Sequence, residues 1–234
     1  MRDGIFLIGK GAAFDMTPEG VMKDLEQSIS RLGVTSLDLY MMHRDNLEVP
    51  VGEFVDLLLG LQSKGLIKAY GGSNWTPERI KAAELYAKKK GLPVIAASSP
   101  NFCLARWNAP MWGGCVTATD EKSRAFYRRT GLPLFAWSAT ASGFLTGRFK
   151  ASDAKRLGPN DPVVQTWFNR ENLDRLQRLL KASKRTGFSP AAIVLDQPMN
   201  AFALIGPQSI AEMNDSLSSL SVDREILTAN ALEI

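Results

Sequence analysis

Two short hydrophobic runs near the N-terminus each lead into a side chain that can carry a proton. Lys10 follows the run Ile5–Ile8, and His43, the only histidine of the chain, follows the run Leu37–Met42. In a chain that alternates strands and helices, the C-terminal ends of the strands lie on one face, where such folds place their catalytic groups. Lys10 and His43 are therefore predicted to come together and to offer a proton donor and a positive charge to one reacting group.

Short apolar runs carry the strand signal. They contain four to six residues with little alternation, which is typical of strands buried on both faces of a parallel sheet. The predicted strands are Ile5–Ile8, Leu37–Met42, Ile67–Gly71, Val94–Ala97, Leu134–Trp137 and Phe202–Ile205.

Longer segments between these runs have the 3.6-residue periodicity of helices. Apolar residues recur at helical spacing from Val21 to Leu32 and again from Phe54 to Leu61. A hydroxyl side chain followed by proline marks a helix start, because the hydroxyl caps free amides and proline suits the first helical position. Such pairs occur at Thr17-Pro18, Thr76-Pro77 and Ser189-Pro190.

The order of elements is a strand followed by a helix, repeated six times, with extra helices predicted at Asn169–Thr186 and Pro190–Met199. This alternation predicts a parallel sheet with right-handed crossovers. The turn after the first strand, Gly9–Phe14, lacks the G-x-G-x-x-G pattern, which weakens the alternative of an open dinucleotide-binding sheet. The length of 234 residues is close to the roughly 250 of a βα barrel. We expect one domain over residues 1–234.

Composition limits the functional classes. A net charge of +4 with a pI near 9.1 suits an anionic small ligand, and it lacks the clustered bases of a nucleic-acid-binding protein. Cys103 and Cys115 form no metal-like spacing, so we expect free thiols and no metal site. Neither a signal peptide nor a membrane-spanning apolar stretch is evident, which predicts a cytoplasmic protein without membrane contact.

Four segments together match the motifs of a known family. They are Arg31–His43 (RLG followed by LDLYMMH), Gly65–Asn74 (GLIKAYGGSN), Trp137–Arg148 (WS followed by GFLTGR) and Ala203–Ser209 (ALIGPQS). In combination they resemble the aldo-keto reductases, (β/α)8 barrels of the TIM type that reduce carbonyl groups with a nicotinamide cofactor. The resemblance implies an incomplete barrel with about six parallel strands and surrounding helices.

The resemblance also implies roles for individual residues. Lys10 and His43 fall on the family's catalytic lysine and histidine, and a lysine ammonium and an imidazole N–H are suitable donors to a carbonyl oxygen that gains charge. Ser73 and Asn74 fall on the pair that holds the nicotinamide carboxamide. The other implied cofactor contacts are Ser98 at the carboxamide, Trp137 at the nicotinamide ring, Ser138, Gly143, Leu145, Gly147 and Arg148 at the pyrophosphate, and Gly206, Gln208, Ser209 and Asp215 near the adenosine.

A general-acid tyrosine and a lysine-pairing aspartate precede the strand equivalent to Ile5–Ile8 in this family. Two βα units, about 60 residues, are therefore expected to be absent. No tyrosine of the chain is a suitable substitute, because Tyr40 and Tyr70 face away by strand alternation and Tyr86 and Tyr127 lie on predicted helices. The missing strands would leave two unpaired edges, which predicts a homo-oligomer or a partner chain that covers them.

These observations predict an NADP(H)-dependent, aldo-keto-reductase-like oxidoreductase that transfers hydride between nicotinamide and a carbonyl or alcohol substrate. NAD(H) stays open as the cofactor, because no lysine or arginine lies between Gly206 and Ser216 to meet a 2′-phosphate. Trp107 and Trp112 suggest only an apolar or aromatic carbonyl substrate. The alternatives are a catalytically impaired relic that binds cofactor or a protein partner, the C-terminal part of a longer reductase, and Schiff-base chemistry on Lys10.

Overall fold

The structure is a computed structural model that describes residues 4–195, 199–223 and 225. The chain divides into two compact units, Met1–Pro100 with Leu132–Leu134, and Asn101–Gly131 with Phe135–Ile234. The expectation of one barrel domain over residues 1–234 stays a prediction.

Six parallel strands with surrounding helices confirm the predicted α/β class. The strands are hydrogen-bonded in chain order, β1-β2-β3-β4-β5-β6. Each of the first four pairs has a parallel register, as when Lys10 lies opposite Met41 and Ser73 opposite Ser99. The strand bounds are β1 (Ile8–Gly11), β2 (Leu37–Met42), β3 (Ile67–Ser73), β4 (Ala97–Ser99), β5 (Leu134–Ala136) and β6 (Ala201–Ala203).

Strand boundaries are the part of the prediction that was wrong. An apolar run shows which side chains are suited to burial, whereas a strand extends only as far as its backbone pairs with a neighbour. Ile5 and Phe6 are apolar but 57% and 64% exposed, and β1 begins after them, so that Lys10 lies inside the strand. The other shifts place β3 two residues beyond Gly71, β4 at Ala97–Ser99 instead of Val94–Ala97, β5 one residue short of Trp137, and β6 at Ala201–Ala203 instead of Phe202–Ile205.

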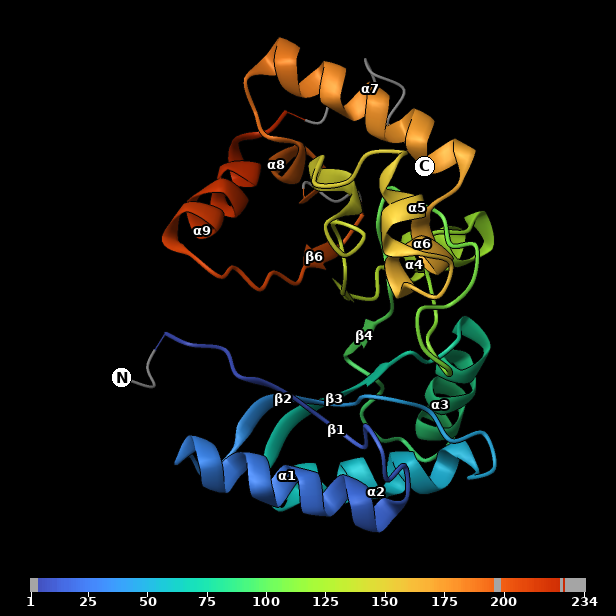
Figure 1. Cartoon of the computed structure of the whole chain (residues 1–234). Helices are drawn as coiled ribbons and strands as arrows, with labels where there is room; N and C mark the ends of the chain where they lie inside the picture. The colour runs from blue at the N-terminus through green and yellow to red at the C-terminus, as the bar shows by residue number, and fades with distance from the viewer. Residues whose placement is uncertain (1–3, 196–198, 224, 226–234) are drawn as a thin grey trace. The chain divides into compact units, whose positions relative to one another are not determined.

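The helices of the first unit confirm the predicted caps. The Thr17 hydroxyl accepts the Gly20 amide at 3.1 Å, and the Thr76 hydroxyl accepts the Arg79 amide at the same distance. Figure 1 shows α1 and α2 side by side along the strands β1 to β3. The helices are α1 (Pro18–Leu32), α2 (Val51–Ser63) and α3 (Pro77–Lys89).

The second unit is richer in helices than the sequence predicted. The predicted helix Asn169–Thr186 begins one residue later, because the Asn169 side chain caps it. Helix α8 ends at Leu195; residues 196–198 lie outside the described residues, and Met199 has a positive φ of 70°. The helical elements are α4 (Glu121–Thr130), η1 (Phe144–Thr146), α5 (Asp153–Leu157), α6 (Pro162–Trp167), α7 (Arg170–Thr186), α8 (Pro190–Leu195), α9 (Ile210–Leu217) and η2 (Ser218–Ser221).

Tyr40 fixes the contact between β1 and α1. Its side chain is fully buried, and its hydroxyl donates a hydrogen bond of 2.9 Å to the Val21 carbonyl. This hydroxyl also lies where a Cβ on Gly11 would stand, and that Cβ would be only 2.9 Å from the Asp24 Cβ. Only glycine therefore fits at position 11 against the tyrosine and the helix.

We expect Gly11→Ala to lower the free energy of unfolding by about 2–3 kcal/mol, because the added methyl group overpacks this contact. Tyr40→Phe alone removes one buried hydrogen bond, at a cost of about 1 kcal/mol. The double variant Gly11→Ala, Tyr40→Phe lacks the clashing hydroxyl. Its free energy of unfolding should therefore fall by less than the sum of the two single-variant losses, by at least about 0.5 kcal/mol. Urea unfolding of the three variants measures this coupling.

Gly60→Ala is the matched control for this double-mutant cycle. Gly60 lies inside α2, and a Cβ there would meet no atom within 4 Å. Alanine should stabilise the helix by about 0.5–1 kcal/mol at such a position. Strictly additive losses in the cycle would show that the Tyr40 hydroxyl does not require glycine at position 11.

Candidate functional site

Lys10 is held by two serine hydroxyls at adjoining strand ends. Its Nζ donates to Ser99 Oγ at 2.8 Å and to Ser73 Oγ at 3.3 Å. The Ser73 hydroxyl in turn donates to the Ser99 carbonyl at 2.7 Å. The predicted Lys10 and Ser73 therefore meet, and Ser99 joins them as a residue that sequence reasoning missed.

The ammonium group of Lys10 has no carboxylate partner among residues 4–195, 199–223 and 225. Burial without a compensating negative charge disfavours the charged form and lowers the pKa of Lys10 to about 8. Lys10 is consequently still mostly protonated at neutral pH, and it becomes a neutral amine only slightly above it.

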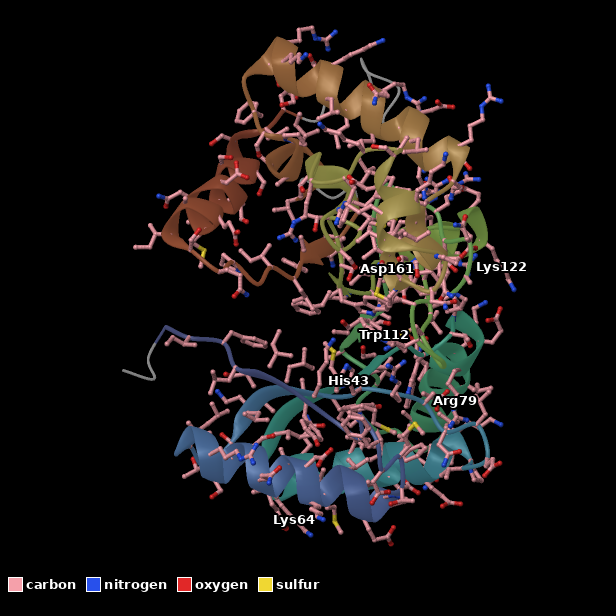
Figure 2. All side chains as sticks on the ribbon, in the orientation of Figure 1. His43, Lys64, Arg79, Trp112, Lys122 and Asp161 are labelled. Atoms are coloured by element: carbon pink, nitrogen blue, oxygen red, sulfur yellow. The ribbon has the colours of Figure 1, made fainter. Side chains whose placement is uncertain are left out.

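His43 lies beside Lys10 because its backbone continues the ladder between β1 and β2. The His43 amide donates to the Gly11 carbonyl at 2.6 Å. Burial, then the positive charges of Lys10 and Arg44, lower the pKa of His43. The imidazole is thus neutral at neutral pH and has one N–H to donate. Figure 2 shows His43 over the strands on the side opposite α1 and α2.

Asn74 completes this group at the end of β3. Its Nδ2 donates to the His43 carbonyl at 3.0 Å, and its amide donates to the Ser99 carbonyl at 3.2 Å. Its φ of 59° lies in the left-handed region, which asparagine tolerates better than most residues. Ser98 is fully buried on β4, and its side chain points to the face opposite that of Ser99, because side chains alternate along a strand.

The tyrosines lie as the sequence predicts. Tyr40 bonds to α1, and the Tyr70 hydroxyl donates to the Pro93 carbonyl at 3.0 Å. Burial raises the pKa of Tyr70 to about 12. Tyr86 lies on α3 and Tyr127 on α4. Neither strand tyrosine forms a hydrogen bond with Lys10 or His43, so neither serves as a tyrosine acid at this group.

Several predicted cofactor residues line one cavity in the second unit, with a volume of about 590 Å³. The predicted residues on its wall are Ser138, Gly143, Arg148, Gly206, Gln208 and Asp215. Sequence reasoning missed Glu212, which lies on the same wall. The sequence did contain a pattern that could have indicated Glu212, because Ser209 and Glu212 have the spacing of a helix-capping pair.

The segment between Ser138 and Arg148 has an unusual backbone. Ala141, Ser142 and Gly143 are three consecutive residues with φ between 54° and 84°. The amides of Ser142 and Gly143 donate to no other residue that the structure describes. Successive free amides in such turns form an anion-binding concavity. This cavity therefore fits a diphosphate, with Arg148 as the cation on its wall.

Four predicted cofactor residues of the second unit do not line this cavity. Leu145 is buried in the hydrophobic core, and Gly147 ends η1 with φ 82°. The Ser209 hydroxyl caps α9 by accepting the Glu212 amide at 3.2 Å. Trp137 packs between Trp107 and Trp112, with ring centroids 5.9 and 6.3 Å away.

Two other kinds of site were sought among the described residues. None of their His, Cys, Asp and Glu side chains form a group that could hold a metal ion. No helix within that part of the chain is long and apolar enough to cross a membrane.

Comparison with known sequences identifies the family. The sequence model described as "Aldo/keto reductase family" matches residues 1–229. The chain belongs to this family. Among its curated relatives is an uncharacterized oxidoreductase, YrpG of Bacillus subtilis, which is 24% identical over 88% of this aldo/keto reductase and 61% of the relative.

Two further relatives have named carbonyl substrates. The NADH-specific methylglyoxal reductase of Escherichia coli is 25% identical over 71% of this chain and 46% of its own length. The 6-dehydroglucose reductase of Novosphingobium aromaticivorans is 25% identical over 95% of this chain and 66% of its own length. The chain thus spans about half to two thirds of the length of these curated relatives.

A solved structure supports the fold assignment. "Crystal structure of a putative 2,5-diketo-D-gluconic acid reductase B" superimposes with a TM-score of 0.69 and 18% sequence identity. The match covers 98% of this aldo/keto reductase and 68% of that chain. At this identity the likeness establishes the fold, and the absence of two βα units stays a prediction.

We expect Lys10→Met to stabilise the protein at pH 7 by about 2 kcal/mol, because it removes a buried charge without a counter-ion. The folded-state pKa of Lys10, about 8, lies below the usual lysine value of 10.5. The folded protein therefore binds fewer protons between these values, and wild-type stability rises with pH across that window. The advantage of Lys10→Met should shrink as the pH rises toward 10.

Urea unfolding at pH 7 and pH 9.5 checks this dependence. Lys64→Met is the matched control, because Lys64 is exposed after α2 and its removal should produce no such trend. A difference between Lys10→Met and wild type that is the same at both pH values would contradict a buried, unpaired ammonium group.

Proposed function

We propose that this chain carries the reaction-promoting lysine and histidine of a nicotinamide-dependent oxidoreductase that acts on a carbonyl or alcohol substrate. The observation that carries the proposal is the meeting of Lys10, His43 and Asn74 at neighbouring strand ends. Membership of the aldo/keto reductase family supports it. The names of two relatives, a methylglyoxal reductase and a 6-dehydroglucose reductase, support a carbonyl compound as the substrate class.

The chemistry expected of the two side chains follows from their protonation. A bound nicotinamide cofactor supplies the hydride. The carbonyl oxygen gains negative charge during the transfer, so donors aimed at it lower the barrier. The protonated Lys10 and the neutral imidazole N–H of His43 are such donors, and His43 is suited to hold the oxygen while Lys10 supplies positive charge.

The cavity of the second unit is proposed to hold the diphosphate of the cofactor. Its unpaired amides at Ser142 and Gly143 and the guanidinium of Arg148 suit two negative phosphates. Family membership does not distinguish between NADP(H), which the sequence predicted, and NAD(H). One relative is named as NADH-specific. The cytoplasmic location and a homo-oligomer or partner chain at the sheet edges also stay predictions.

We expect the purified full chain to oxidise NADH or NADPH in the presence of at least one member of a carbonyl panel. His43→Gln should lower kcat by about 10²–10³-fold, because it removes a donor to the developing oxyanion. Lys64→Gln should leave kcat unchanged. Initial rates at 340 nm measure both effects. Absence of cofactor-dependent turnover across the panel would contradict the proposal for this chain.

A second candidate function, covalent capture of a carbonyl compound, is favoured by Lys10 alone. With a pKa of about 8 and no carboxylate partner among the described residues, Lys10 reaches equal amounts of ammonium and reactive neutral amine at about pH 8. The amine adds to the carbonyl carbon to form a carbinolamine. Loss of water then gives an imine, with the departing hydroxyl taking a proton from solvent and the nitrogen releasing one.

Borohydride separates this candidate from hydride transfer by nicotinamide. The full chain incubated with a small aldehyde, such as glyceraldehyde, and sodium borohydride at pH 8 should gain one reduced adduct on Lys10. Peptide mass spectrometry locates the adduct, and Lys10→Met should lose it, while Lys64→Met keeps it. Equal labelling of Lys10 and the exposed lysines would exclude covalent capture as a specific function.

A further inference from the structure

The charged residues on the cavity of the second unit come from two segments, the turn after η1 and the helix α9. Among the described residues that line it, Arg148 is the one cation, and Glu212 and Asp215 are the two anions. The Arg148 side chain lies against Gly143, within 3.7 Å of the position of a Cβ there. Glu212 instead contacts the Gln208 amide at the start of α9. We call the wall beside Gly143 the cationic end, and the wall formed by α9 with Glu212 and Asp215 the anionic end.

The anionic end retains unused acceptor capacity. Glu212 Oε2 accepts the Gln208 amide at 2.7 Å, which occupies one of its several lone-pair sites. The Asp215 carboxylate forms no ion pair or hydrogen bond with another side chain in the part of the chain that the structure describes. Arg148 is likewise bound to neither acid, so no internal ion pair neutralises this end.

A dinucleotide presents two chemically different parts to such a cavity. The diphosphate belongs at the cation and the unpaired amides. The adenosine part then faces the acids, where ribose hydroxyls and the adenine amino group donate hydrogen bonds to carboxylates. A phosphate at the ribose 2′ position would instead add a charge near −2 to an end that already carries two negative charges.

We propose that this cavity selects NAD(H) over NADP(H), with Glu212 and Asp215 as the residues that determine the preference. This inference rests on the proposed function, since it requires that the cavity binds a nicotinamide dinucleotide at all. The sequence predicted NADP(H), whereas the charge of the cavity wall favours NAD(H).

Glu212 also has a structural role, which the experiment must leave intact. It accepts the Gln208 amide, while the Ser209 hydroxyl accepts the Glu212 amide, as in a capping box. Glu212→Gln keeps an acceptor oxygen of the same shape, and Asp215→Asn does the same. These variants remove charge while they preserve the cap of α9.

The test is a titration of the full chain with NADH and with NADPH, followed by tryptophan fluorescence and by the melting temperature. We expect wild type to bind NADH at least about tenfold more tightly than NADPH, because the 2′-phosphate meets like charges. In the double variant Glu212→Gln, Asp215→Asn the ratio should fall below about threefold. Glu48→Gln, an exposed loop variant of the same charge change, should keep the wild-type ratio.

The outcomes separate this inference from the proposed function. NADPH binding as tight as NADH, or tighter, in wild type would overturn the inference and leave nicotinamide binding intact. An unchanged ratio in the double variant would overturn the role of the two acids. Binding of neither nucleotide would overturn the proposed cofactor site itself. Arg148→Met should weaken both nucleotides by a similar factor, since the diphosphate is common to them.

Discussion

The hydrogen bond from the His43 amide to the Gly11 carbonyl is the constraint on which the first unit's group of polar residues depends. It extends the β1–β2 ladder past the end of β2, so the chain turns away only after His43 has been placed beside Lys10. Asn74 then ties the His43 carbonyl to β3 and its own amide to the Ser99 carbonyl. Four strand ends are therefore joined by two backbone hydrogen bonds and by the Asn74 side chain, which together place Lys10, His43 and Ser99.

Much of this arrangement could be predicted from the sequence. The periodicity of the helices and the hydroxyl–proline caps indicated α1, α2 and α3, and the family motifs pointed to Lys10, His43, Ser73 and Asn74. Ser99 escaped prediction because its role depends on the register of β4 against β3, and one residue of slip exchanges it with Ser98. The short helices α5 and α6 escaped because five or six residues are too few to show a period.

The protonation states and ion pairs of the site could not be predicted from the sequence, because they depend on which charged side chains lack a partner of opposite charge in the fold. Lys10 is surrounded by hydroxyl groups that accept hydrogen bonds but carry no charge, so burial controls its protonation. The cavity of the second unit instead has charges of both signs. Arg148, Glu212 and Asp215 lie on the same wall without forming an ion pair. The uncompensated charge of the buried Lys10 lowers stability, which is the usual mark of a residue that serves a ligand.

The distribution of tryptophans has a spectroscopic consequence. Trp107, Trp112, Trp137 and Trp167 form a chain of ring contacts in the second unit, each with a centroid separation of 5.9–6.3 Å to the next. Trp75, the fifth, lies in the first unit under the Arg79 guanidinium. Excitation will migrate among these four indoles, whose contacts are tilted or edge-on, and produce coupled near-ultraviolet circular dichroism bands. Trp75 takes part in none of these three ring contacts, so within its own unit it reports on the surroundings of Arg79.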